Sequence, residues 1–529
     1  MSDQVPGRAD TPIGQEGVFS RRSSGLIRTI GTRDALWYGL NAITIAYVTF
    51  TIVYWASYQG ASYEWSTVLT VAGAIGVGVV YALFAAVYPR SGGEYVFLSR
   101  TVSAPVGFVV SFIQTFWYAF YFGINGAFFA IFGLAPLFTT LGLQTHNNTL
   151  QSIGTFFSGH WGIFLGGSFI VVLIGSMAYI GMKAFFRIQR WCTLIALGST
   201  VVTLVVLALG WSGTLNFASN FNALAGSGAY QSVTSHVTVP PLALYATLCF
   251  VVWPAFSIMF SVNMVSFSGE IKDFKRGPLV AIVGSMILAG LIFILFFVFA
   301  RGAMGDKFLI GSATTAKFPL PLEPFVNSMA SILAHNWFLT IVINLWVILI
   351  IPFAAGSNII YTSRAVLAWS IDGIAPAKLG AVSTRTFTPA LAILALAVIA
   401  EIWLAVYAFT TWVTILSGLL GFAFAFLVVS LTGIIFPYVK KEAFENSPAA
   451  IRVGGVPLMT IAAVIGSVFS AWILYRCIVD RTFGATTALS VWMTVAAFVG
   501  GVVWFFVARW YRRRQGVAVD QRLHEIPIE

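Results

Sequence analysis

Polar and aromatic side chains recur at regular spacing along one long stretch of the sequence. Residues 101–182 contain no Asp, Glu, Lys or Arg, and the recurring side chains there are three or four positions apart: Ser111, Gln114, Tyr118, Tyr121 and Asn125. This spacing places them on one face of a helix. Such a polar stripe either binds a small solute or holds neighbouring helices together, and both alternatives stay open. Phe128, in the same stretch, is expected to lie outside the stripe.

Sequence motifs of common enzyme classes are missing. The chain has no G-x4-G-K-[ST], H-E-x-x-H, G-x-S-x-G or C-x-x-C pattern, so nothing indicates an ATP-driven pump or a familiar hydrolase or redox site. The three cysteines, Cys192, Cys249 and Cys477, lie far apart in apolar segments, as small core residues do. We therefore expect no enzyme activity, no catalytic residue, no metal site and no cofactor.

The composition is that of a helical membrane protein. Hydrophobic residues make up 58% of the 529 residues and charged residues only 9%, against roughly 25% charged residues in soluble domains. Many uncharged runs exceed the roughly 20 residues that a helix needs to cross a bilayer. The predicted fold class is therefore all-α and integral to the membrane, with about twelve spans, at 35–58, 65–88, 104–134, 161–182, 189–211, 241–268, 278–301, 338–369, 389–409, 412–437, 456–477 and 485–509.

The distribution of basic residues predicts the orientation of these spans. If the N-terminus is cytosolic, 24 of the 29 Lys and Arg fall in cytosolic segments and 5 in outer ones, as the positive-inside rule requires. We therefore expect cytosolic tails at 1–33, which reads as disordered, and at 510–529. The net charge of +11 is spread over short loops facing anionic lipid, so a lipid bilayer is the expected partner and nucleic acid is not. The loop from Arg90 to Arg100 is predicted to be cytosolic.

Three stretches on predicted cytosolic boundaries carry a family resemblance. They are "YPRSGGEYVFLSR" at 88–100, "SGEIKDFKRGP" at 268–278 and "YTSRAVLAWSIDGIAPAKLGAVSTRTFTP" at 361–389. Together they resemble amino acid permeases of the amino acid–polyamine–organocation superfamily. The resemblance implies a five-plus-five inverted repeat in a ten-helix core at 34–437, with repeats at 34–211 and 241–437. Two additional transmembrane helices at 438–509 follow the core.

The resemblance also implies where substrate binds. In such folds the first helix of each repeat is broken near the bilayer midplane, and the freed backbone groups line the site. In span six, Pro254 disfavours a continuous helix, and the family register places the unwound stretch on Phe256–Phe260. In span one the break is expected at 43–47, with the hydroxyls of Thr44 and Thr49 bonding freed backbone groups; an unbroken helix is the alternative. The predicted substrate-binding residues are Ile43, Thr44, Ile45, Ala46, Tyr47, Tyr118, Tyr121, Trp253, Phe256 and Ser257.

The function implied is secondary active transport of amino acids across the plasma membrane by alternating access. The interiors of spans one, three, six, eight and ten carry no Asp or Glu, which favours a neutral, apolar or aromatic amino acid over a cationic one. The ion-coupling candidates are Ser357 and Glu401, and the resemblance favours protons over sodium. Alternatives are a transporter of amines, polyamines or another small organic solute, a passive facilitator, and a nutrient sensor built on a transporter scaffold. The oligomeric state is not indicated.

Overall fold

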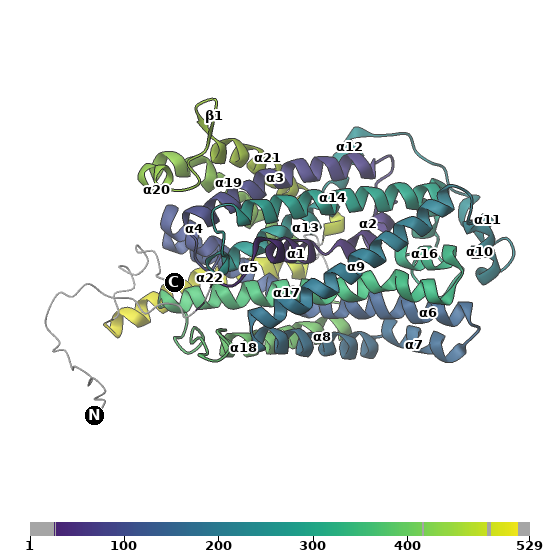
Figure 1. The fold of residues 1–529 in the computed structure, drawn as a ribbon, viewed down its shortest axis with the longest axis horizontal. Helices are drawn as coiled ribbons and strands as arrows, with labels where there is room; N and C mark the ends of the chain where they lie inside the picture. Colours follow the sequence, from purple (N-terminus) through teal and green to yellow (C-terminus); the bar gives the residue numbers. More distant parts are fainter. Residues whose placement is uncertain (1–25, 27, 415–416, 484–487, 517–529) are drawn as a thin grey trace, which may run out of the picture.

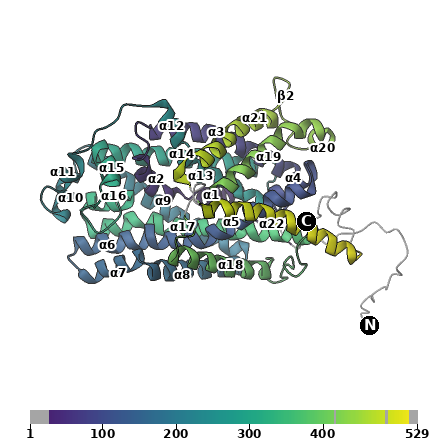
Figure 2. The ribbon, with the colours of Figure 1, turned by 180° about the vertical axis from the view of Figure 1, so that it is seen from behind.

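Twelve helical segments form one elongated bundle. The structure is a computed structural model and describes residues 26, 28–414, 417–483 and 488–516. Within these residues, twelve segments are long and apolar enough to cross a membrane, and each coincides with a predicted span. They run along the long axis of the molecule (Figures 1 and 2). The tails predicted at 1–33 and 510–529 lie largely outside the described residues.

Most spans are single helices. They are α3 (Tyr63–Val87), α8 (His160–Ile180), α9 (Met182–Trp211), α14 (Gly277–Met304), α17 (Trp337–Ile371), α18 (Ala390–Phe409), α19 (Leu419–Val439), α21 (Leu458–Val479) and α22 (Ala488–Arg514). Shorter elements connect them: α4 (Glu94–Thr101), α7 (Asn148–Ser158), α10 (Phe217–Ala225), α11 (Ala229–Thr234), α15 (Asp306–Thr314), α16 (Val326–Ala334), α20 (Lys441–Glu445), η4 (Arg481–Phe483) and the hairpin of β1 (Arg452–Val453) and β2 (Val456–Pro457).

The third span is longer than predicted. It comprises α5 (Ala104–Phe128), a π-helical segment η2 (Phe129–Leu134) and α6 (Ala135–Gln144), whereas the sequence placed its end at 134. Pro136 enters at the start of α6. In the π-helical turn before it, the backbone hydrogen bonds span five residues instead of four, and the chain then continues as an α-helix. The tenth span is shorter than predicted, because α19 begins at Leu419 rather than at 412.

The first span is broken where the sequence predicted it. Helix α1 (Thr32–Ile43) ends at Thr44, whose φ of 56° is left-handed, and the 3-10 turn η1 (Ile45–Tyr47) leads into α2 (Val48–Trp55). A β-branched residue rarely adopts this conformation. The Thr44 hydroxyl donates to the Asn41 carbonyl at 3.0 Å, and the Thr49 hydroxyl donates to the Ala46 carbonyl at 2.7 Å. The alternative of an unbroken helix is therefore wrong.

The sixth span is also interrupted, but not where the sequence predicted. It consists of α12 (Leu244–Phe250), α13 (Val252–Ile258) and a 3-10 helix, η3 (Met259–Glu270), with a turn at Val251. The predicted unwinding across Phe256–Phe260 is wrong, since α13 continues to Ile258 and η3 follows directly. The reason is Pro254: it has no N–H to bond the Phe250 carbonyl four residues earlier. The helix is consequently interrupted before the proline rather than after it.

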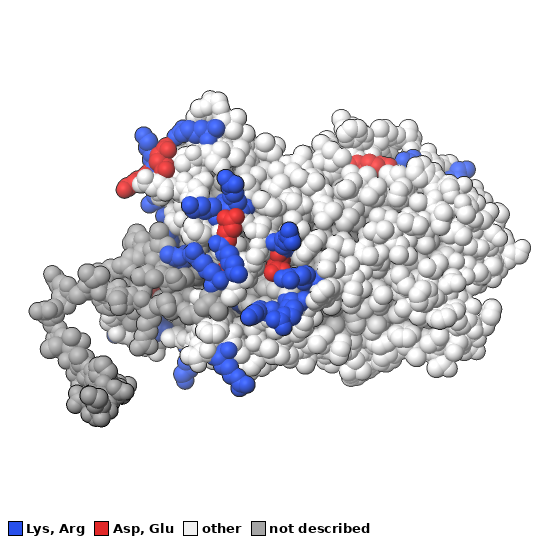
Figure 3. Space-filling view, viewed as in Figure 1, with Lys and Arg blue, Asp and Glu red and all other residues white. Residues whose placement is uncertain are grey.

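Basic side chains gather at one end of the bundle. Figure 3 shows Lys and Arg concentrated at the end where the described chain begins and where α22 finishes, with few at the other end. We call these the basic end and the far end. The far end carries α10 and α11 (Figure 1). This asymmetry matches the distribution of charge that the sequence predicted between alternate loops.

Candidate functional site

A small cavity lies between the two interrupted spans, α5 and the start of α19. Its volume is about 30 Å³, room for about two water molecules and too small for an organic solute. Four of its lining residues were predicted from the sequence: Tyr47, Tyr121, Trp253 and Phe256. The remaining lining residues are Phe50, Phe128, Phe260 and Leu419.

Two of the missed residues carried a signal in the sequence. Phe128 follows Asn125 by three positions and therefore continues the polar stripe by one more turn; the prediction that it lies outside the stripe's face is wrong. Phe50 follows Tyr47 by three positions on α2, and the two rings are 5.1 Å apart. Leu419 carried no signal, because the start of span ten was placed seven residues too early.

The other predicted residues hold the site rather than line it. Ile43 to Ala46 are buried at the break in span one. The Ser257 hydroxyl donates to the Ile43 carbonyl, which provides a partner for a carbonyl at the end of α1 and joins the two interrupted spans. Tyr118 is buried beside the cavity: its ring lies 5.9 Å from that of Phe260, and its hydroxyl donates to Asn263 on η3.

The polar stripe on α5 divides between the two roles that the sequence left open. Near the cavity, Asn125 accepts a hydrogen bond from Tyr47 at 2.6 Å. Toward the basic end, Gln114 accepts one from Tyr361 on α17 at 2.7 Å. Ser111 accepts one from the Trp369 indole, also on α17, at 3.2 Å. The stripe therefore positions the cavity at one end and fastens α5 to α17 at the other.

Aromatic rings cover the cavity toward the far end. Trp253 stacks on Tyr54 with ring centroids 4.0 Å apart and planes inclined by 15°. Phe483 in η4 packs on the same indole at 5.2 Å. Stacked aromatic pairs contribute about 0.5–1.5 kcal/mol beyond their buried area, so this cover is stable yet can be displaced.

Two buried ion pairs join the three family-like stretches at the basic end. Arg100, in the first stretch, contacts Asp372, in the third, at 2.7 Å; Arg364, in the third, contacts Glu270, in the second, at 3.0 Å. All four side chains are at most 3% exposed. Tyr95 also donates to Asp372 at 2.7 Å. We call the two ion pairs the basic-end clamp, since they hold α4, η3 and α17 together.

Two adjacent glycines allow the first stretch to enter the bundle. Gly92 and Gly93 have φ values of 119° and 58°, which residues with a Cβ rarely adopt. A Cβ on Gly92 would lie 2.5 Å from the Cβ of Ala368, and its N–H donates to the Ser266 carbonyl at 2.9 Å. The expectation of an arginine-bearing loop facing lipid is therefore wrong for Arg100, which is buried in the clamp because the glycine turn directs α4 inward.

The sequence of the chain matches a known protein family. A model of the family described as amino acid permease matches residues 30–507. The chain belongs to this family. The match spans all of the cavity and the clamp and reaches into the twelfth span. The permease is therefore a multi-pass membrane protein with the fold of this superfamily, as the three stretches predicted.

The two ion-coupling candidates of the permease lie away from the cavity lining. The Ser357 hydroxyl donates to the Ala354 carbonyl of its own helix at 2.7 Å. Glu401 on α18 accepts a hydrogen bond from Ser168 on α8 at 2.7 Å and is half-buried. Among the described residues, no group of three or more His, Cys, Asp or Glu is placed to hold a metal ion.

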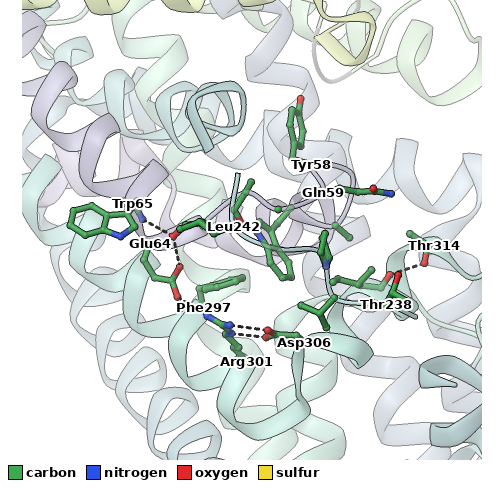
Figure 4. A pocket seen from close by; sticks show the side chains of 18 of the residues that line it. Tyr58, Gln59, Glu64, Trp65, Thr238, Leu242, Phe297, Arg301, Asp306 and Thr314 are labelled. Atoms are coloured by element: carbon green, nitrogen blue, oxygen red, sulfur yellow. Dashed lines mark hydrogen bonds and ion pairs between the residues drawn. The ribbon is translucent and has the colours of Figure 1, made fainter. Parts of the chain in front are cut away.

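A larger hollow opens on the side of the permease toward the far end. It encloses about 690 Å³ between α3, α14, α15 and the segment before α12. Figure 4 shows Arg301 directed at Asp306 and Glu64, with the Arg301 Nε 2.6 Å from Asp306. Its walls include Trp65 and Leu242, which are 63% and 71% exposed. The hollow is thus open along its side, and its charged groups contact one another.

Proposed function

We propose that this permease is a secondary active transporter of neutral amino acids with apolar or aromatic side chains, working by alternating access and coupled to protons. The observation that carries the proposal is the chemistry of the cavity: its lining residues are all aromatic or aliphatic, with no charged side chain among them. A cationic side chain would lose its hydration there without gaining a partner, whereas an apolar side chain gains free energy from burial.

Backbone groups at the break in span one supply partners for the amino acid's own charges. The helical stretch after the break begins with η1 at Ile45 and continues as α2, and the positive end of its helix dipole suits a carboxylate. The C-terminus of α1 presents carbonyls of opposite polarity at Thr44, next to the same break, which suits an ammonium group. These two ends explain how a zwitterion binds without a charged side chain.

Alternating access follows from the two closures of the cavity. Opening toward the far end requires Trp253 to leave Tyr54, and opening toward the basic end requires the clamp to separate. We further propose that the basic end faces the cytosol, with both termini there, in a plasma membrane; the supporting argument is the excess of Lys and Arg on that side.

Uptake into proteoliposomes tests the proposal. We expect labelled leucine or phenylalanine to accumulate against its gradient when a pH difference is imposed, and unlabelled neutral amino acids to compete. Strong competition by arginine or putrescine with none by leucine or phenylalanine would overturn the substrate assignment. Accumulation that follows sodium and ignores pH would overturn proton coupling, and equilibration without accumulation would identify a passive facilitator. An absence of any flux, with substrate still bound, would favour a sensor.

A further inference from the structure

The buried carboxyl of Glu94 has no partner on another residue. It is the first residue of α4, directly after the two glycines, and its side chain is completely buried. Within the described part of the chain, no other residue donates a hydrogen bond to either of its carboxyl oxygens. Only its own backbone N–H favours the ionised form, and it does so less than burial opposes it. A buried ionised carboxylate without a partner is very costly, and such a group takes up a proton instead.

The surroundings of Glu94 contain polar groups but no neutralising cation. Tyr81 on α3 and Tyr118 on α5 lie within electrostatic range of it. Tyr361 on α17 packs against the adjacent Gly93. On its own helix, Tyr95 and Arg100 are both bonded to Asp372. Helix α19, also packed against α4, carries no Asp, Glu, Lys, Arg or His. On η3, Ser266 lies beside Gly93, and Asn263 accepts the hydrogen bond from Tyr118.

The nearby Arg364 forms an ion pair of the clamp with Glu270, at 3.0 Å. Burial is consequently the dominant influence on Glu94 and raises the pKa of its carboxyl to about 8. In the closed form the group is therefore mostly protonated near neutral pH.

Glu94 also lies between the cavity and the clamp. On one side it is close to Tyr118, whose ring packs on the cavity-lining Phe260 at 5.9 Å. On the other side it begins the short helix that ends with the clamp residue Arg100. A change in the charge of Glu94 therefore affects both the packing beside the cavity, through Tyr118, and the stability of the clamp, through the helix that carries Arg100.

We propose that the Glu94 carboxyl is the proton-binding site that couples transport to the pH difference across the membrane. This inference rests on the proposed function. With the clamp closed, Glu94 holds its proton. When the clamp separates, water and the released arginines reach the carboxyl, its O–H bond breaks, and the proton passes to water and leaves a carboxylate. Reclosing the clamp requires a proton to be bound again, because the bare carboxylate cannot be buried alone.

The test compares Glu94→Gln with wild type in two assays. Glutamine mimics the protonated form, so we expect Glu94→Gln to retain exchange of internal for external substrate. We expect it to lose accumulation driven by an imposed pH difference, which for one coupled proton reaches about tenfold per pH unit. An exposed acidic residue on α20 provides the control, since Glu445→Gln should leave both assays at wild-type values.

The outcomes separate failure of the inference from failure of the proposed function. If wild type shows no pH-driven accumulation, the proposed proton coupling fails. If wild type accumulates substrate and Glu94→Gln does so equally, this inference is overturned. If only Glu401→Gln loses accumulation, the proton-binding site is Glu401 on α18 instead of Glu94. If Glu94→Gln does not fold, Glu94→Asp decides: the pH midpoint of its uptake should shift, and an unchanged midpoint overturns the proposal.

Discussion

Replacing Asp372 by Asn should destabilise the protein strongly, because it removes one charge from a buried pair and leaves the other. Arg100 and Asp372 are 3% and 0% exposed, and their N···O distance is 2.7 Å. At that distance, with an effective dielectric constant of about 20, the attraction is about 6 kcal/mol. Asparagine can still accept the hydrogen bond from Tyr95, so the loss is specific to the charge. We expect a cost of about 3–5 kcal/mol in the free energy of unfolding.

An exposed ion pair elsewhere in the chain is the matched control. Arg452 and Glu445 contact each other at 2.5 Å, but their side chains are 43% and 39% exposed. Glu445→Gln should therefore cost only about 0–1 kcal/mol, since water screens the pair. Unfolding of the purified protein in mild detergent, followed by intrinsic fluorescence against increasing denaturant, measures both variants.

Two results would refute this reasoning. The first is a cost for Asp372→Asn no larger than that for Glu445→Gln. The second concerns the double variant Arg100→Met with Asp372→Leu: replacing both charges by apolar side chains should recover most of the loss. If the double variant is as unstable as Asp372→Asn, the cost does not come from burying the Arg100 charge without the Asp372 charge.

Three further predictions follow from the cavity, the bundle and Glu94. Phe256→Ala should raise the KM for a neutral substrate at least severalfold. Phe169→Ala, on the exposed surface of α8, should leave that KM unchanged, and equal effects of the two variants would show that Phe256 does not contact the substrate. In a cysteine-free background, Ser227→Cys and Lys275→Cys should react with an impermeant thiol reagent from opposite sides, and reaction from one side contradicts the twelve-span arrangement. Because burial raises the pKa of Glu94 to about 8 from 4.5, the folded state holds more protons than the unfolded state between these values. Stability should therefore fall as pH rises from about 4.5 to about 8, and Glu94→Gln should weaken this dependence.

The spans, their number and the excess of charge at one end were predictable from the sequence. They depend on local properties: a run of apolar residues must be long enough to cross a bilayer, and basic residues mark alternate loops. The break in span one was also placed correctly at 43–47. Half of the cavity lining was predicted: Tyr121 from the periodicity of α5, Tyr47 from the break expected in span one, and Trp253 and Phe256 from the family register around Pro254.

The remaining features depend on contacts between distant segments. Tertiary packing placed Phe260 and Leu419 in the cavity lining. It also turned the stretch at 88–100 from an expected surface loop into a buried helix. The adjacent glycines show in the sequence that the backbone turns there, but only the packing of α4 against α17 decides that the turn leads inward.

The sequence by itself therefore determined the membrane-spanning class, the family and which two helices are interrupted, because apolar length, charge and chain-breaking residues act locally. Only the tertiary structure decided which charges are paired and which are buried. Arg100 meets Asp372 across 272 positions of the chain, and no local pattern records such a pairing. The same packing leaves the carboxyl of Glu94 alone in the interior, which is what makes that residue a candidate for binding a proton.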